Sequence, residues 1–96
     1  MVQFDDSRLA AICRRRGVTQ LRLFGSAARG EETPASDLDL IADFGGPTGF
    51  FGLIRCEDEL TEFFGRSVDL LTEGGLSPYM RANVLAEAKV LFDDAA

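Results

Sequence analysis

The chain has 96 residues, of which 46% are hydrophobic, and its 10 basic and 16 acidic residues give a net charge of −6. This size and composition predict one globular domain over residues 1–96, with no membrane span, no secretory leader and hence a cytoplasmic location. The acidity disfavours direct binding of duplex nucleic acid, whose phosphates attract cations, and the absence of histidine excludes histidine-based acid–base or zinc chemistry.

The apolar periodicity and the turn residues predict helices that alternate with strands. Helical segments carry apolar residues every three or four positions, whereas strand segments alternate apolar and polar residues. In chain order, the expected elements are a helix capped by Asp5 or Asp6 and ended by Gly17, a strand at 20–24, a short helix at 27–29, a strand at 37–44, a helix from a cap at Thr48 to Gly65, a strand at 66–71, a helix capped by Ser77 and an edge strand at 89–92. This order predicts an α/β or α+β sandwich in which helices cover a small sheet.

The aromatic residues and the cysteines are expected to be internal. Phe50 and Phe51 are most simply packing residues of the helix that follows Thr48, and Met80 is expected on the apolar side of the last helix. Cys13 and Cys56 have no metal-ligand spacing. A disulfide between them stays open, although a cytosolic chain favours buried, reduced thiols.

One basic cluster, Arg14 to Arg16, stands out in this acidic chain. It has two interpretations. The cluster is either the solvated end of the first helix, where cations favour the negative pole of the helix dipole, or a docking patch for an acidic partner or a phosphate.

Three aspartates lie inside otherwise apolar strand patterns. Residues two apart share a face of a strand, so Asp37 and Asp39 point to one side and the leucines between and after them point to the core. Asp69 repeats the pattern in the strand at 66–71, and it joins the other two if the two strands are neighbours. Such like charges repel, and Mg²⁺, which prefers oxygen ligands, is the usual counterion. Three carboxylates are enough for a two-metal site.

A turn that suits phosphate binding precedes these aspartates. Gly25 lets the backbone approach a phosphate closely, Ser26 adds a hydroxyl donor, and Arg29 can neutralise a triphosphate oxygen. Each of these residues alone is more often an ordinary turn, cap or surface charge. Their joint order with the aspartates argues for a site.

This joint order resembles the signature of a known superfamily. Gly25 and Ser26, ten residues and then Asp37-Leu38-Asp39 match the Gly-Ser-x10-Asp-x-Asp pattern of the polymerase-β-like nucleotidyltransferases. The string "FGSAARGEETPASDLDLIADF" and the later "VDLL" resemble the minimal nucleotidyltransferases, the MNT antitoxins that are paired with HEPN-domain toxins. The resemblance covers about residues 20–92 and implies the polymerase-β-like fold.

The resemblance also implies roles for the residues of this chain. The nucleotide-binding residues would be Gly25, Ser26 and Arg29, and the catalytic, metal-holding carboxylates would be Asp37, Asp39 and Asp69. The implied cofactor is a pair of Mg²⁺ or Mn²⁺ ions, and Asp69 would also take the proton of the acceptor hydroxyl. Many relatives carry arginine where this chain has Ala27, so one cationic phosphate contact is expected to be missing.

The resemblance implies transfer of AMP from ATP to a tyrosine of a HEPN-type RNase toxin, which silences the toxin. The short chain independently favours a partner protein as acceptor, because something else must position the acceptor. Two alternatives remain. One is a catalytically silent antitoxin that neutralises its partner by complex formation, which the intact aspartates disfavour. The other is a small-molecule nucleotidyltransferase, for example for an aminoglycoside, which would need an acidic acceptor pocket.

Overall fold

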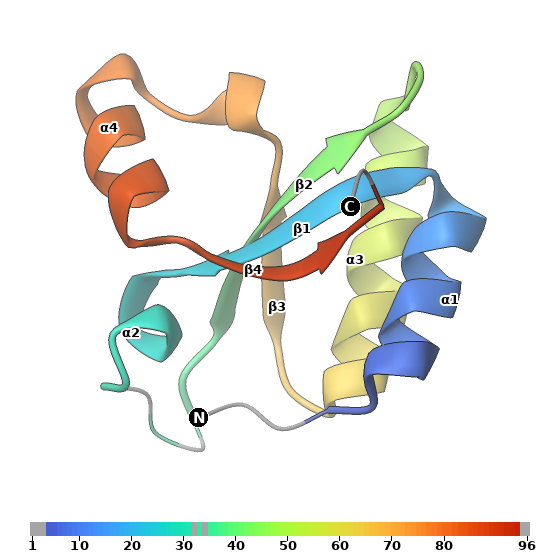
Figure 1. The fold of residues 1–96 in the computed structure, drawn as a ribbon, viewed down its shortest axis with the longest axis horizontal. Coiled ribbons are helices and arrows are strands. Elements are labelled where there is room, and N and C mark those ends of the chain that lie inside the picture. The colour runs from blue at the N-terminus through green and yellow to red at the C-terminus, as the bar shows by residue number, and fades with distance from the viewer. Residues whose placement is uncertain (1–3, 32, 34, 95–96) are drawn as a thin grey trace.

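The computed structural model of the chain describes residues 4–31, 33 and 35–94. Within these residues, helices and strands alternate as expected, with one 3₁₀ turn after the third strand (Figure 1). The helices are α1 (Asp6–Arg16), α2 (Gly25–Ala28), α3 (Phe50–Phe64) and α4 (Pro78–Glu87), the strands are β1 (Val18–Phe24), β2 (Leu38–Phe44), β3 (Val68–Leu71) and β4 (Lys89–Asp93), and the 3₁₀ turn is η1 (Glu73–Gly75). None of the helices in this described part is long and apolar enough to cross a membrane.

The strands form one mixed sheet in the order β3-β2-β1-β4. β1 runs antiparallel to β2 and to β4, while β2 and β3 run parallel. α1 and α3 cover one face of the sheet and enclose the larger apolar core, whereas α4 packs on the other face (Figure 1). The predicted α+β architecture, a small mixed sheet covered by helices, is therefore confirmed.

Local sequence signals explain where the helices begin and end. The Asp5 side chain accepts a hydrogen bond from the Arg8 N–H at 3.1 Å and so caps α1. Gly17 ends α1 with φ of 79°, a conformation that glycine adopts without a steric cost. Ser77 caps α4, as predicted. The predicted cap at Thr48 is wrong, because α3 begins after Gly49 and has no side-chain cap.

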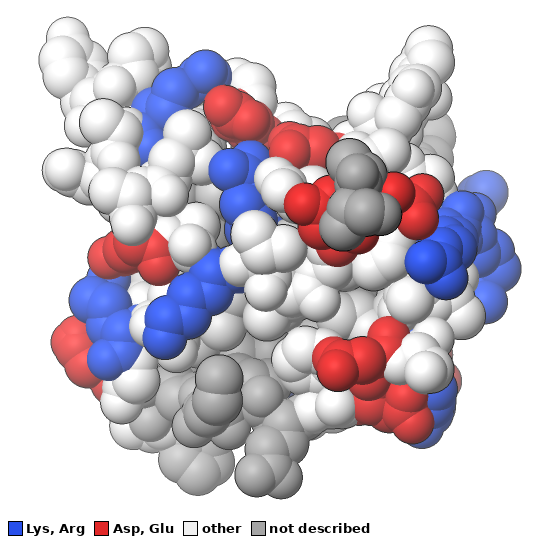
Figure 2. Space-filling view, in the orientation of Figure 1, with Lys and Arg blue, Asp and Glu red and all other residues white. Residues whose placement is uncertain are grey.

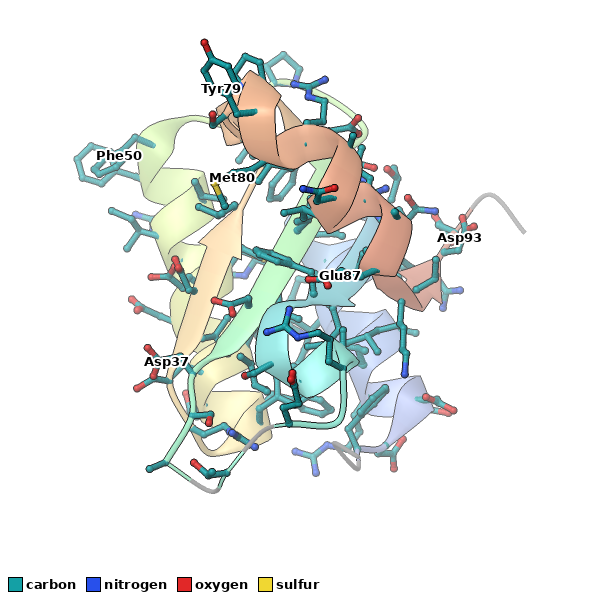
Figure 3. All side chains as sticks on the ribbon, turned by 90° about the vertical axis from the view of Figure 1, so that its left-hand side faces the viewer. Asp37, Phe50, Tyr79, Met80, Glu87 and Asp93 are labelled. Atoms are coloured by element: carbon teal, nitrogen blue, oxygen red, sulfur yellow. The ribbon has the colours of Figure 1, made fainter. Side chains whose placement is uncertain are left out.

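Three apolar residues that we expected to be internal are exposed. Phe50, Phe51 and Met80 keep 72%, 73% and 54% of their surface accessible. The buried residues of α3 are Cys56 and Leu60. At about 100° per residue, Phe51 lies on the side of the helix opposite Leu60. Phe50 projects from the first turn of α3 toward solvent (Figure 3).

The two cysteines are free and buried, as expected for reduced thiols. Burial raises the pKa of Cys13 to about 12, with a further contribution from Cys56, and burial also raises the pKa of Cys56 to about 11. Both groups are therefore protonated thiols near neutral pH. Because the thiolate is the reactive form, they act as packing residues between α1 and α3 rather than as nucleophiles.

The basic end of α1 is engaged in ion pairs. Arg14 contacts Asp94 at 3.3 Å, Arg16 contacts Glu59 at 2.7 Å, and Arg15 also pairs with Glu59. Figure 2 shows that basic side chains on this face lie beside acidic ones and form no continuous basic surface. These ion pairs agree with the helix-end interpretation. Arg14 and Arg15 stay largely exposed, and the docking-patch interpretation stays a prediction.

Candidate active site

The sheet register brings two of the predicted carboxylates together. β2 and β3 pair in parallel, with Asp39 directly opposite Asp69. Leu38 and Leu40 are fully buried on the other face of β2, so the predicted alternation of acidic and apolar sides holds at the start of the strand. Farther along, Ile41 lies on the Asp39 side and is buried in the apolar cluster under α4, so this side is not acidic throughout. Asp37 immediately precedes β2, and it lies at the start of the strand beside β3 in Figure 3.

Asp39 is the carboxylate most affected by this arrangement. Burial raises its pKa above the usual range, and the negative charges of Asp69 and Asp37 raise it further, while Arg29 opposes them. The charges of Asp37 and Asp69 therefore both act on the Asp39 carboxylate. Among the described residues, no three acidic, cysteine or histidine side chains are arranged to hold a metal ion as they stand. In the described part of the chain, Asp39 and Asp69 are therefore neighbours in the sheet, but the carboxylates are not arranged as a metal-binding site.

Gly25 is packed against this group. It has φ of 73°, and a Cβ at this position would lie 2.4 Å from Oδ2 of Asp39. Real Cβ atoms essentially never lie so close to another atom, so a larger residue would force the Asp39 carboxylate or the backbone to shift. Glycine avoids this shift and also the strain of the positive φ. The sequence suggested Gly25 for its ability to approach a phosphate. The structure adds that Gly25 also makes room for the Asp39 carboxylate.

Arg29 and Gly25 share an acidic partner that the sequence did not indicate. Glu87, the last residue of α4, accepts hydrogen bonds from the Gly25 N–H at 3.2 Å and from Nη1 of Arg29 at 3.0 and 3.2 Å. Glu31 accepts a further bond from Arg29 Nε at 2.9 Å. Both acidic partners raise the pKa of Arg29 above its ordinary value. Ser26 is half-buried in the first turn of α2, where it follows Gly25 directly.

Arg66, another residue missed in the sequence, fastens the loop that leads into Asp37. Its guanidinium donates to the Ser36 carbonyl at 2.6 and 3.1 Å and to the Thr33 carbonyl at 2.8 Å. In addition, the Leu38 N–H donates to the Ser67 carbonyl at 2.9 Å. The start of β2 is therefore tied to the start of β3. No pattern in the sequence marks a contact from an arginine side chain to backbone carbonyls.

For the nucleotidyl transfer that the sequence resemblance implies, an Arg66→Ala substitution should slow the reaction without changing its chemistry. Loss of these bonds lets Asp37 move relative to Asp69, and misplaced reacting groups cost about tenfold or more in rate. We expect kcat to fall by roughly that factor with little change in KM for the nucleotide. Steady-state kinetics and thermal denaturation would measure both effects. Arg55→Ala, which removes an exposed arginine of α3, is the matched control. An equal loss in both variants would contradict a positioning role for Arg66.

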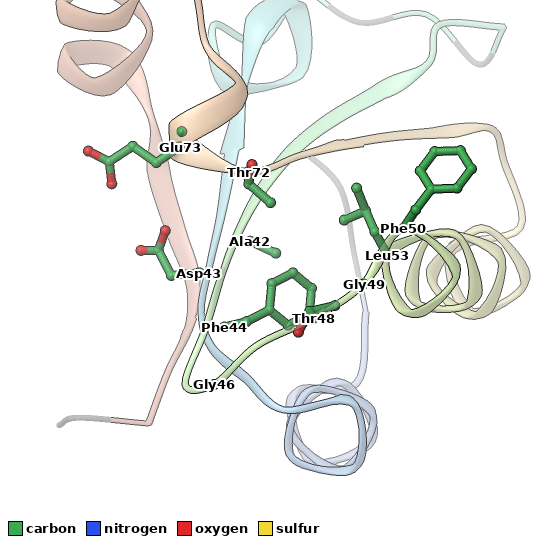
Figure 4. Close-up of a pocket in the computed structure, with 11 residues that line it drawn as sticks. Ala42, Asp43, Phe44, Gly46, Thr48, Gly49, Phe50, Leu53, Thr72 and Glu73 are labelled. Atoms are coloured by element: carbon green, nitrogen blue, oxygen red, sulfur yellow. The ribbon is translucent and has the colours of Figure 1, made fainter.

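A pocket of about 460 Å³ lies away from these carboxylates, between the end of β2, the start of α3 and η1 (Figure 4). Its acidic lining residues, Asp43 and Glu73, each pair with Arg22 at 3.3 Å. A single guanidinium therefore lies between these two carboxylates. The pocket contains none of the predicted site residues, so the chemistry is better placed at the open surface around Asp39.

Comparisons with known proteins identify the family and the fold of this chain. The family model "Nucleotidyltransferase domain" matches residues 7–91. A Methanocaldococcus jannaschii protein named "Putative protein adenylyltransferase MJ0435" is 35% identical over 81 residues, which are 84% of this chain and 87% of the relative. The solved "Structure of putative minimal nucleotidyltransferase" has a TM-score of 0.76 and 37% identity, and the match covers 88% of this chain and 86% of that one.

A third comparison extends the likeness of the fold. The "Crystal structure of the toxin-antitoxin with AMP-PNP" has a TM-score of 0.77 at 18% identity, and the match covers 94% of this chain and 74% of that chain. At this identity the likeness concerns the fold alone.

The mixed sheet with its strand-borne aspartates is the polymerase-β-like nucleotidyltransferase fold, as the sequence resemblance implied. The chain belongs to the nucleotidyltransferase domain family. It is an enzyme of the minimal nucleotidyltransferase type.

Proposed function

We propose that this protein is a metal-dependent protein adenylyltransferase that acts as an antitoxin on a HEPN-type RNase toxin. The observation that carries the proposal is the placement of Gly25, Asp39 and Asp69 around one point of the sheet. The named activity of the 35% identical relative supports AMP transfer to protein. The toxin–antitoxin neighbour with AMP-PNP supports a nucleotide substrate and a toxin partner, and the HEPN class comes from the sequence resemblance.

In the proposed reaction, the oxygen of a tyrosine hydroxyl attacks the α-phosphorus of ATP. A bond forms between that oxygen and the phosphorus, and the bond from the phosphorus to the bridging oxygen of the β-phosphate breaks. Pyrophosphate leaves with that electron pair. Asp69, exposed at the edge strand β3, takes the proton of the hydroxyl. Gly25, Ser26 and Arg29 bind the phosphates and hold the α-phosphorus in line.

The donor set of the site suits magnesium or manganese. Asp37, Asp39 and Asp69 offer only oxygen atoms. Burial raises the pKa of Asp39 most, and the negative charges of Asp69 and Asp37, which a cation would offset, raise it further. These three residues would hold the ions, which would neutralise charge on the phosphate oxygens when bound. The chain itself contributes the binding of the phosphates, the orientation of the acceptor and the proton transfer.

We propose that residues 1–96 form one catalytic domain and that the partner supplies the acceptor. The acidic chain does not favour a nucleic-acid primer as acceptor, because phosphate binding needs a basic surface. The face drawn in Figure 2 presents no such surface.

Co-expression with the product of the neighbouring gene, followed by its intact mass, would test the proposal. We expect the partner to gain one or more adenylyl groups with the wild-type enzyme and none with Asp69→Asn. Asp58→Asn, which neutralises an exposed aspartate of α3, should leave the modification unchanged. An unmodified partner that is still neutralised in a stable complex would favour a silent antitoxin. Label from ATP on a small molecule would favour a small-molecule transferase.

A further inference from the structure

Glu87 makes contacts that the proposed reaction does not explain. Its carboxylate accepts the Gly25 N–H at 3.2 Å and two bonds from Nη1 of Arg29 at 3.0 and 3.2 Å. These donors belong to two of the three residues assigned above to the triphosphate. Figure 3 shows Glu87 at the end of α4 beside α2. An internal anion therefore occupies the donors that the nucleotide is expected to use.

Glu87 and a phosphate cannot both use these donors fully. A single N–H has one hydrogen, which points in one direction, and the Gly25 N–H is engaged with Glu87. Bonds between ionised partners are roughly twice as strong as neutral ones, so their loss is costly. A triphosphate that binds through Gly25 and Arg29 must therefore displace the carboxylate. The cost of displacement is subtracted from the affinity for the nucleotide.

The packing of α4 explains why Glu87 lies at this position. Val84 is buried in an apolar cluster with Phe24 and Ile41, and Leu85 packs against the same cluster. Phe24 directly precedes Gly25 in the chain. Because α4 is anchored on the residue next to Gly25, its last turn delivers the Glu87 carboxylate to the Gly25 N–H.

We propose that Glu87 is an internal competitor of the nucleoside triphosphate. The proposal rests on the nucleotide site proposed above. Without nucleotide, Glu87 holds Gly25 and Arg29. When the triphosphate binds, its phosphate oxygens take over these donors, and the last turn of α4 is released from α2. Glu87 thereby limits the affinity for the nucleotide and couples its binding to the position of α4.

Calorimetric titration of the full chain with ATP and Mg²⁺ tests this competition. Loss of the Glu87 charge weakens the contacts that the nucleotide must replace, so Glu87→Gln should lower Kd by roughly threefold to tenfold. Glu87→Ala removes the acceptor entirely and should lower Kd at least as much. Glu62→Gln, at an exposed glutamate of α3, changes the net charge equally and should leave Kd within about twofold, as expected for a distant surface charge. Thermal denaturation would confirm that each variant is folded.

A second readout follows the displaced group directly. In wild type, saturation with ATP and Mg²⁺ should shift the amide resonances of Gly25 and of Glu87 to Lys89, because Glu87 leaves its donors. In Glu87→Ala, the Gly25 amide should still shift while the last turn of α4 should respond little.

The outcomes separate this inference from the proposed function. If wild type binds ATP but Glu87→Gln and Glu87→Ala bind it equally or more weakly, Glu87 orients Arg29 for the nucleotide and the competition is wrong. An equal gain in Glu62→Gln would also contradict it, since the effect would be one of net charge. If neither wild type nor any variant binds ATP, the nucleotide site itself is wrong, and the inference is wrong with it.

Discussion

An Asp39→Asn substitution is expected to reduce nucleotidyl transfer strongly while making the metal-free protein more stable at neutral pH. Asp39 lies at the centre of the acidic group, opposite Asp69 in the register. The substitution removes a carboxylate that would hold a metal ion beside the reacting phosphate. The rate of transfer should therefore fall by about a hundredfold or more. Asparagine has nearly the same shape, and the packing against Gly25 should therefore survive.

The stability change has a definite sign. Burial and the neighbouring aspartates raise the pKa of Asp39 in the folded protein, so the folded state binds this proton more tightly than the unfolded state does. Protonated Asp39 therefore stabilises the folded state at low pH. This stabilisation is lost as the pH rises through the folded-state pKa of Asp39. Asp39→Asn should therefore unfold at a higher temperature than wild type near pH 7. The difference should disappear toward pH 4 or below, about where a free aspartate is protonated.

Thermal denaturation in EDTA over this pH range, with transfer assays at neutral pH, would measure both effects. Asp58→Asn serves as the control, because it neutralises an exposed aspartate of α3 outside the site. If Asp39→Asn were less stable than wild type at neutral pH, the ionised carboxylate would stabilise the fold. That result would contradict the raised pKa of Asp39, which means that ionised Asp39 destabilises the folded state. Retained transfer activity would remove Asp39 from the catalytic group.

The sequence predicts the acidic face because that face depends on a local rule. Alternation along one strand places Asp37 and Asp39 on the side opposite Leu38, and no knowledge of the partner strands is needed. The position of Asp69 depends on strand order, which the sequence left as a condition. The parallel pairing of β2 with β3 meets that condition.

The contacts that the sequence missed are tertiary. Glu87 reaches Gly25 only because α4 packs on the α2 side of the sheet, and Arg66 reaches Ser36 only because β3 lies beside β2. Neither residue differs in its sequence context from an ordinary surface charge. The exposed Phe50 and Phe51 show the converse case. A hydrophobic side chain is buried only where the fold provides a surface to cover it, and the first turn of α3 lacks one.

A Gly25→Ala substitution is expected to cause a large loss of both stability and nucleotide binding. The new Cβ would lie 2.4 Å from Oδ2 of Asp39 and 3.3 Å from its Cγ, so the carboxylate or the backbone of α2 must shift. The left-handed conformation also destabilises alanine, relative to glycine, by about 1–2 kcal/mol. Overpacking against Asp39 should add roughly 1–3 kcal/mol. The shift should also move the phosphate donor away from the carboxylates.

Gly30 offers a matched control for the backbone term. It has the same φ of 73°, but no atom lies within 4 Å of a Cβ built on it. Gly30→Ala should therefore lose only the conformational term, and the difference between the two variants isolates the contact with Asp39. Chemical denaturation would give the free energies of unfolding, and calorimetry would give nucleotide affinities.

The pair Gly25 and Asp39 allows a stricter test. In an Asp39→Ala background, the atom nearest the new Cβ is removed, and the remaining Cβ of residue 39 lies at an ordinary contact distance of 3.4 Å. Gly25→Ala should then cost no more stability than Gly30→Ala does. If Gly25→Ala is equally damaging in both backgrounds, the damage comes from the backbone alone. In that case the requirement for glycine at this turn would owe nothing to the carboxylate beside it.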